Sequence, residues 1–253
     1  MTTKYEPSSI DNFRKFISYK FKDPDEVSVI FDIGSLHCLE SVELSKVYKN
    51  AHIYAFEANP ESYKVCVENT KDIDNITVIN KAINDHDGTC VFNAIDPEKT
   101  ETPWFDGNRG ASSLFKANGK YDHIEKYVQK EIEVPCIQLG TFCKENNINN
   151  VDVMWMDLQG AELIALESMG KELLNTVQVI HTELETTPIY KNQCLFSDVN
   201  QFLKNNGMYR AEGNSSLEFG QNFIFVRKKR KYTSDNLGAV SYTHLTLPTI
   251  VRV

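Results

Sequence analysis

Several features that mark specialised protein classes are absent from this sequence. No apolar run approaches the roughly 20 residues needed to cross a bilayer, and the polar segment 1–7 does not begin a secretion signal. The six cysteines include no C-x-x-C pair, and the histidines show no H-x-x-x-H spacing. We therefore expect no membrane span and no metal site, and we expect reduced thiols in a cytoplasmic protein.

Positive charge is also scarce. The chain has 27 Lys and Arg residues against 35 Asp and Glu residues, which gives a formal net charge of -8. An acidic surface repels phosphate backbones, so we expect no nucleic-acid partner. The basic run Arg227–Lys231 is either a site for nucleic acid or anionic lipid or a solvated chain end, and the overall acidity favours the solvated chain end.

The sequence does contain the pattern of one α/β domain. Hydrophobic residues make up 41% of the 253 positions, enough for a single well-packed core. Short β-rich runs alternate with amphipathic helical stretches, which predicts right-handed βαβ units and a doubly wound, mostly parallel sheet. We expect a leading helical segment at 1–26, the domain at 27–232, and a disordered or artefactual tail outside the core at 233–253.

The expected elements are placed by hydrophobic periodicity and turn residues. Asn59 and Pro60 mark a helix start, and the last two strands are close enough in sequence to pair antiparallel at a sheet edge. The region from Pro97 to Lys130 has weak periodicity and is expected to be a long functional loop. The expected strands are 27–33, 52–56, 76–83, 88–94, 132–137, 151–156, 177–182, 208–212 and 221–226, and the expected helices are 8–21, 36–48, 59–69, a short one from 141, 161–174 and 197–205.

The first strand-to-helix turn has little glycine. A dinucleotide-binding turn needs G-x-G-x-x-G so that the backbone can approach a pyrophosphate, but here only Gly34 is present and Cys38 stands near the place of a later glycine. A nucleoside ligand without phosphates, such as S-adenosylmethionine, needs less of that close approach. Asp32, at the end of the strand, either accepts hydrogen bonds from the amino group of such a ligand or only holds the turn.

Two further strands also end in acidic residues. Glu57 follows the second strand, about 25 positions after Asp32, where it can bind ribose hydroxyls, stabilise the next helix dipole, or do both. Asp157 follows the strand at 151–156, where it either orients a substrate and accepts a proton or only anchors the next helix. Glu162, in the first turn of that helix, has a structural and a functional interpretation of equal weight.

With these segments in this order, the chain resembles the FkbM family of methyltransferases over roughly Val27 to Val226. The resemblance implies a class I methyltransferase fold, S-adenosylmethionine as cofactor, and in many cases O-methylation of sugars or natural products. Gln159 stands where many members have Glu, and Cys38 replaces a glycine of the commoner first motif. The resemblance rests on four blocks in order, namely Asp32 to Gly34, Phe56-Glu57-x-Asn59-Pro60, Asp157-Leu158-Gln159-Gly160-Ala161-Glu162, and Glu183 with Pro188-Ile189-Tyr190.

The predicted activity is therefore methyl transfer from S-adenosylmethionine to a hydroxyl of a small molecule or glycan. A neutral hydroxyl needs a general base, for which Asp157 and Glu183 are the candidates. Two other hypotheses remain, a nicotinamide-dependent oxidoreductase and a non-catalytic nucleoside-binding module of the same fold. We assign cofactor binding to Asp32, Gly34, Ser35, Glu57, Asn59 and Ala82, and substrate contact through a loop that acts as a lid to Ser112, Ser113 and Tyr190.

Overall fold

The computed structural model describes residues 7–216 and 220–228. Its main feature is a seven-stranded sheet in the order β3-β2-β1-β7-β8-β10-β9. Strands β3, β2, β1, β7 and β8 run parallel, and β10 pairs antiparallel with both β8 and β9. The predicted doubly wound, mostly parallel sheet with an antiparallel edge is therefore confirmed.

The elements follow one another in the expected alternation. The strands are β1 (Val29–Ile33), β2 (His52–Phe56), β3 (Ile76–Ile79), β4 (Ala82–Ile83), β5 (Gly88–Ile95), β6 (Gln129–Ile137), β7 (Val153–Met156), β8 (Val179–Leu184), β9 (Met208–Glu212) and β10 (Gln221–Arg227). The helices are α1 (Pro7–Lys20), α2 (Leu39–Val47), α3 (Pro60–Thr70), α4 (Leu139–Glu145), α5 (Glu162–Ser168), α6 (Lys171–Leu174) and α7 (Phe196–Asn205), with 3-10 turns η1 (Pro24–Glu26) and η2 (Arg109–Ala111).

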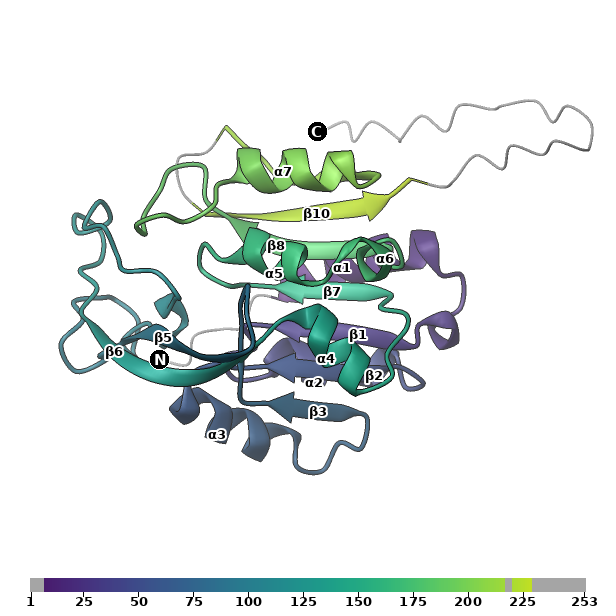
Figure 1. Ribbon diagram of the computed structural model, residues 1–253, viewed down its shortest axis with the longest axis horizontal. Helices are drawn as coiled ribbons and strands as arrows, with labels where there is room; N and C mark the ends of the chain where they lie inside the picture. Colours follow the sequence, from purple (N-terminus) through teal and green to yellow (C-terminus); the bar gives the residue numbers. More distant parts are fainter. Residues whose placement is uncertain (1–6, 217–219, 229–253) are drawn as a thin grey trace, which may run out of the picture.

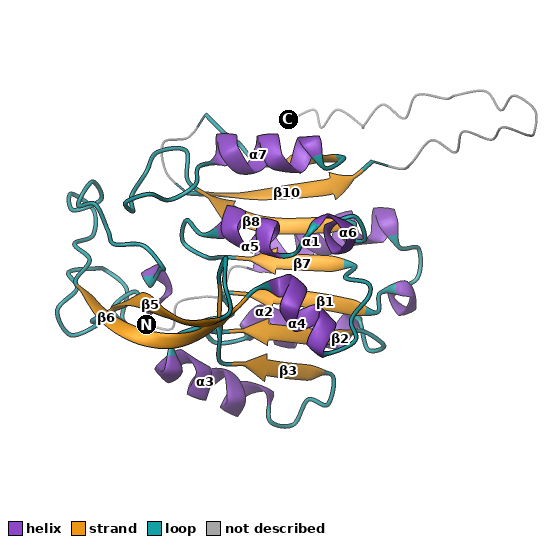
Figure 2. Cartoon of the chain, in the orientation of Figure 1, coloured by secondary structure: helices purple, strands orange, loops and turns teal. Residues whose placement is uncertain are grey.

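Two apolar layers hold the helices against the two faces of the main sheet (Figure 2). On one face, Phe142 of α4 and Leu203 of α7 pack with the strand side chains Phe31 and Met156. On the other face, Phe13 of α1 packs with strand residues of the same sheet. Helix α1, which belongs to the segment predicted to precede the domain, thus contributes buried side chains to the core of the sheet.

A second, smaller sheet in the order β4-β6-β5 lies beside the ends toward which the parallel strands point (Figure 1). Strands β5 and β6 form a long antiparallel pair that joins Gly88 with Cys136 and Ile95 with Gln129. The segment between them holds η2 and isolated bridges but no long element, as the weak periodicity predicted. This lobe and the carboxyl ends of the main strands enclose the site described below.

Two predicted elements are wrong in their extent. The strand expected at 76–83 is divided because Asn80 leaves the main sheet and its side chain donates to the backbone carbonyl of Glu57 at 2.8 Å. Strand β4 then joins the smaller sheet. The single helix expected at 161–174 is divided into α5 and α6 at Gly170, whose φ of 76° is incompatible with a continuous α-helix.

The basic run does not begin as a solvated chain end. Arg227 ends β10, and its guanidinium group donates to the backbone carbonyls of Val177 at 2.6 Å, Asn206 at 2.8 Å and Leu174. Residues 229–231 of the run and the predicted tail 233–253 lie outside the described residues. Within residues 7–216 and 220–228, no helix has both the length and the apolar character that crossing a bilayer requires.

Candidate active site

The turn after β1 is built around Gly34. Its φ is +86°, and the backbone N–H groups of Gly34 and Ser35 both donate to the carbonyl of Phe56 at 3.0 Å. Leu36 and Cys38 also have positive φ values, 47° and 57°. Cys38 thus occupies a left-handed position that glycine adopts without steric cost, which gives a physical reason for the glycine of the commoner motif.

Glu57 bridges the first two strand ends. Its carboxylate accepts hydrogen bonds from the backbone N–H groups of Leu36 and Asn59, each at 2.7 Å. Asn59 in turn caps α3, where its side-chain oxygen accepts from the N–H of Glu61. Burial raises the pKa of Glu57 to about 7, and the two backbone hydrogen bonds oppose that shift.

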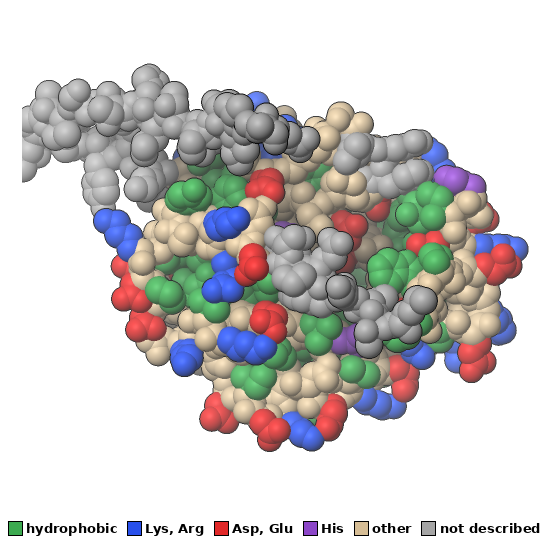
Figure 3. Space-filling view, turned by 180° about the vertical axis from the view of Figure 1, so that it is seen from behind, with side chains coloured by type: hydrophobic (Ala, Val, Ile, Leu, Met, Phe, Trp, Pro, Cys, Tyr) green, Lys and Arg blue, Asp and Glu red, His purple; other side chains and the backbone are tan. Residues whose placement is uncertain are grey.

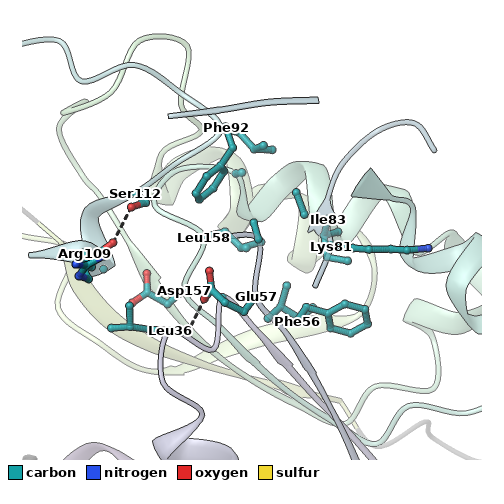
Figure 4. A pocket seen from close by; sticks show the side chains of 17 residues that line it. Leu36, Phe56, Glu57, Lys81, Ile83, Phe92, Arg109, Ser112, Asp157 and Leu158 are labelled. Atoms are coloured by element: carbon teal, nitrogen blue, oxygen red, sulfur yellow. Dashed lines mark hydrogen bonds between the residues drawn. The ribbon is translucent and has the colours of Figure 1, made fainter. Parts of the chain in front are cut away.

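A cleft opens above these strand ends, and we call it the first cleft. Glu57 and Asp157 contribute carboxylates, and in Figure 4 Arg109 and Ser112 lie at the opposite end from Lys81 and Phe56. Most of the remaining walls are apolar. The described residues that line it are Ile33, Gly34, Leu36, Phe56, Glu57, Ala58, Lys81, Ala82, Ile83, Phe92, Arg109, Gly110, Ser112, Leu114, Asp157, Leu158 and Ala161.

Asp157 lies where β7 meets the turn after β1. Its backbone N–H donates to the carbonyl of Ile33 at 2.9 Å, and its side chain accepts from the amide of Gln159 at 2.7 Å. Burial raises the pKa of Asp157, while the hydrogen bond from Gln159 lowers it. Glu162, five residues after Asp157, accepts hydrogen bonds from the backbone N–H groups of Leu158 and Gly160 and so holds the turn closed.

A second pocket lies on the other side of Asp157, and this residue and Gly110 line both spaces. Carboxylates and aromatic rings dominate its walls, and no Lys, Arg or His is among the described residues that line it. The lining residues are Trp104, Asn108, Gly110, Ala111, Tyr121, Glu125, Tyr127, Asp157, Gln159, Glu183, Glu185, Ile189 and Gly220.

The carboxylates of the second pocket are held in a poorly solvated environment. Burial, together with the negative charges of Asp157 and Glu185, raises the pKa of Glu183 well above its usual range. Burial and the charges of Glu162 and Asp157 raise the pKa of Glu185 to about 7. A carboxyl group with a pKa of about 7, such as that of Glu185, can exchange protons near neutral pH, as general bases do.

A match to a known protein family identifies the class of protein in which this site occurs. The family model described as the methyltransferase FkbM domain matches residues 33–210, well over half of the chain. The chain belongs to the FkbM methyltransferase family. This match decides against the nicotinamide-dependent oxidoreductase that the fold alone left open.

Known proteins similar to this FkbM methyltransferase include 2-O-methyltransferase NoeI of Sinorhizobium fredii (strain NBRC 101917 / NGR234), which is 27% identical over 190 residues, 74% of each chain. Among solved structures, precorrin-6y C5,15-methyltransferase from Geobacter metallireducens GS-15 aligns with a TM-score of 0.46 and 15% identity, over 87% of this chain and 88% of that chain. Ribosomal protein L11 methylase from Lactobacillus delbrueckii subsp. bulgaricus aligns with a TM-score of 0.47 and 9% identity, over 88% and 79%.

The structure of the FkbM protein brings part of the predicted cofactor set together. Gly34, Glu57 and Ala82 line the first cleft, whereas Asp32, Ser35 and Asn59 do not. Asp32 lies beneath the turn, with 1% of its surface exposed, and its carboxylate accepts from the hydroxyl of Ser41. Contact of any of these side chains with a cofactor stays a prediction.

The predicted catalytic and substrate residues are distributed between the first cleft, the second pocket and the protein interior. Asp157 lines both spaces, Glu183 lines the second pocket, and Ser112 lines the first cleft rather than the second pocket. The hydroxyl of Ser113 donates to the carbonyl of Gln159 at 2.8 Å, and Tyr190 is buried with 1% of its surface exposed. Sequence reasoning missed Lys81, Arg109, Trp104, Tyr121, Glu125, Tyr127 and Glu185.

Proposed function

We propose that this FkbM methyltransferase transfers the methyl group of S-adenosylmethionine to a hydroxyl oxygen of a small molecule or glycan. The cofactor is assigned to the first cleft and the acceptor to the second pocket. The observation that carries this proposal is the position of Asp157, a residue that lines both spaces. A group that reacts between a cofactor and an acceptor must be reachable from both.

The first cleft suits S-adenosylmethionine by its chemistry. Phe56, Ile83 and Phe92 give apolar walls for an adenine ring, and Glu57 offers carboxylate oxygens to ribose hydroxyls. Because Gly34 has no side chain, the turn after β1 can lie close against the backbone of Asp157 at the wall of this cleft. When bound, the cofactor supplies a methyl group already activated on a positively charged sulfur, so the protein mainly aligns the acceptor with it.

The second pocket suits a hydroxylated ring. Trp104 and Tyr127 provide aromatic surface, and carboxylates such as Glu185 can accept hydrogen bonds from hydroxyl groups. The unbalanced negative charge disfavours acceptors that carry phosphate. Acidic and basic side chains are interspersed on the face seen in Figure 3, without a continuous basic surface for nucleic acid.

Asp157 is the general base we propose for the acceptor hydroxyl. Its carboxylate would take the hydroxyl proton as the methyl group passes from the cofactor sulfur, whose bond to the methyl carbon breaks, to the acceptor oxygen. Its raised pKa makes it a stronger base than an exposed aspartate. Glu183 is the second candidate because it lines only the second pocket and has a raised pKa of its own.

The test is methyl transfer from S-adenosylmethionine to a panel of methyl glycosides and small alcohols, comparing Asp157→Asn with Glu183→Gln. Loss of a general base costs about 10²–10⁴-fold in rate, with cofactor affinity retained. Asp87→Asn, an exposed carboxylate outside both spaces, is the control that should turn over normally. Normal turnover by Asp157→Asn together with loss in Glu183→Gln would move the role of base to Glu183.

A further inference from the structure

Gln159 connects Asp157 to the segment that carries Tyr190. Its side-chain amide nitrogen donates to Asp157 Oδ1 at 2.7 Å, and its side-chain oxygen lies 2.9 Å from the hydroxyl of Tyr190. That hydroxyl is also 2.8 Å from the backbone carbonyl of Ala111 in η2. The Tyr190 hydroxyl therefore lies between the carbonyl of Ala111 in the long loop and the amide that donates to Asp157, and its one proton is shared between these two oxygens.

The backbone around Gln159 is fixed as firmly as its side chain. Gln159 has a φ of 50°, and its carbonyl accepts from the hydroxyl of Ser113 at 2.8 Å. The next residue, Gly160, has a φ of 100°, and its carbonyl accepts from the N–H of Cys194. A Cβ on Gly160 would lie 2.5 Å from that of Gln193, so this turn fits only in one arrangement against the segment that carries Tyr190.

The segment around Tyr190 is itself locked to the same turn. The side-chain oxygen of Gln193 accepts from the backbone N–H groups of Ile189 and Tyr190. Tyr190 is stacked on Tyr127 of the second pocket, with ring centroids 6.4 Å apart. Because a tyrosine hydroxyl in this place can donate to the oxygen of Gln159, the amide is held with its NH₂ group toward Asp157.

We propose that Gln159, oriented by Tyr190, is a positioning residue that keeps Asp157 ionised and fixed between the two spaces. The inference rests on the proposed role of Asp157 in catalysis, but its first test does not need catalysis. An amide donor stabilises the carboxylate form without adding charge, whereas a glutamate at this position would place a second carboxylate against Asp157.

The surroundings of Asp157 are strongly acidic. Negative groups interact with it from each neighbouring element, namely Asp32 of β1, Glu40 of α2, Glu57 after β2, Glu162 of α5, and Glu183 and Glu185 at the end of β8. The cations nearest to this group in the described walls are Lys81 and Arg109, which line the first cleft. Burial favours the protonated form of Asp157, and the hydrogen bond from Gln159 opposes this effect.

The experiment measures chemical unfolding of the full ligand-free chain at pH 4 and pH 8 for wild type, Gln159→Leu and Tyr190→Phe. Loss of the donor should raise the ratio of unfolded to folded protein about tenfold more at pH 8 than at pH 4, because a larger fraction of Asp157 is ionised at the higher pH. Tyr190→Phe should also raise this ratio more at pH 8 than at pH 4, but only about threefold, because the amide of Gln159 remains and loses only its orientation. This second variant keeps the test valid if Gln159→Leu does not fold.

Gln159→Leu and Tyr190→Phe are then each combined with Asp157→Asn and, separately, with Glu183→Gln. In Asp157→Asn the pH-dependent part of both effects should disappear, and in Glu183→Gln it should persist. Equal losses at both pH values, or a pH-dependent loss that survives in Asp157→Asn, would show that Gln159 is only structural and would overturn the proposal. Failure of the proposed methyltransferase reaction would appear elsewhere, as absence of S-adenosylmethionine binding.

Discussion

The backbone carbonyl oxygen of Asp157 lies where a side chain on Gly34 would begin. A Cβ built on Gly34 would be 1.9 Å from that oxygen, well inside the contact distance of real atoms. The two residues come from the ends of neighbouring parallel strands, β1 and β7. Position 34 therefore requires glycine for two separate reasons, its φ of +86° and the lack of space.

Gly34→Ala should accordingly lower the free energy of unfolding and distort the first cleft. We expect a loss of roughly 2–4 kcal/mol, since a strained φ alone costs on the order of 1–3 kcal/mol and the clash with Asp157 adds to it. Gly170→Ala is the matched control, because Gly170 has a φ of +76° but nothing within 4 Å of its built Cβ. Equal losses for the two variants in urea unfolding would show that the clash with Asp157 has no effect.

Glu57→Ala should weaken binding of S-adenosylmethionine and of its demethylated product. The carboxylate lines the first cleft and holds the N–H groups of Leu36 and Asn59. We expect affinity to fall by roughly 1–3 kcal/mol in calorimetry, the cost of leaving buried polar groups unpaired. Glu61→Ala, one turn away on exposed α3 surface, is the control, and unchanged affinity in Glu57→Ala would remove Glu57 from the site.

The buried environment of His181 predicts that the folded protein loses stability in acid. Its ring stacks on Trp155 with centroids 3.6 Å apart, only 3% of its surface is exposed, and neither ring nitrogen has a hydrogen-bond partner. Burial lowers its pKa to about 3. An unfolded histidine takes up a proton near pH 6.5, so this residue destabilises the fold increasingly as pH falls from about 6.5 toward 3.

His181→Phe keeps the ring and removes that titration. The free energy of unfolding of the variant should exceed that of wild type by roughly 1.4 kcal/mol for each pH unit below about 6.5, and this excess should level off near pH 3. The buried carboxylates with raised pKa values act in the opposite direction, so the comparison uses the difference between variant and wild type at each pH. A difference that does not change between pH 7 and pH 4 would mean that His181 finds a partner when protonated.

Much of the fold was predictable because local signals agreed with the packing. Asn59 and Pro60 predicted the start of α3, and the structure shows the cap in place. Apolar runs predicted β1, β2 and β7 because both faces of a parallel sheet are buried. The division at Asn80 was not predictable, because it depends on the carbonyls of Glu57 and Ala58, which follow β2 and are distant in sequence.

The candidate site was predicted only where it follows from strand ends. Glu57 and Asp157 line the first cleft as expected, since residues that end parallel strands gather at one edge. Trp104, Tyr127 and Arg109 were missed because they come from the long segment between β5 and β6, whose path has no periodic signal. Glu185 was a detectable omission, because it lies two residues after Glu183 and shares its direction at the end of β8.

The most direct test of the account is calorimetric titration of the full chain with S-adenosylmethionine, its demethylated product and NAD. We predict saturable binding of S-adenosylmethionine and its demethylated product with one site per chain, and no binding of NAD. Gly34→Ala should weaken the binding of both ligands, because its Cβ would clash with the backbone of Asp157 at the wall of the first cleft. Binding of NAD in place of S-adenosylmethionine, or S-adenosylmethionine affinity unaffected by substitutions at both Gly34 and Glu57, would contradict the assignment of the first cleft as the cofactor site.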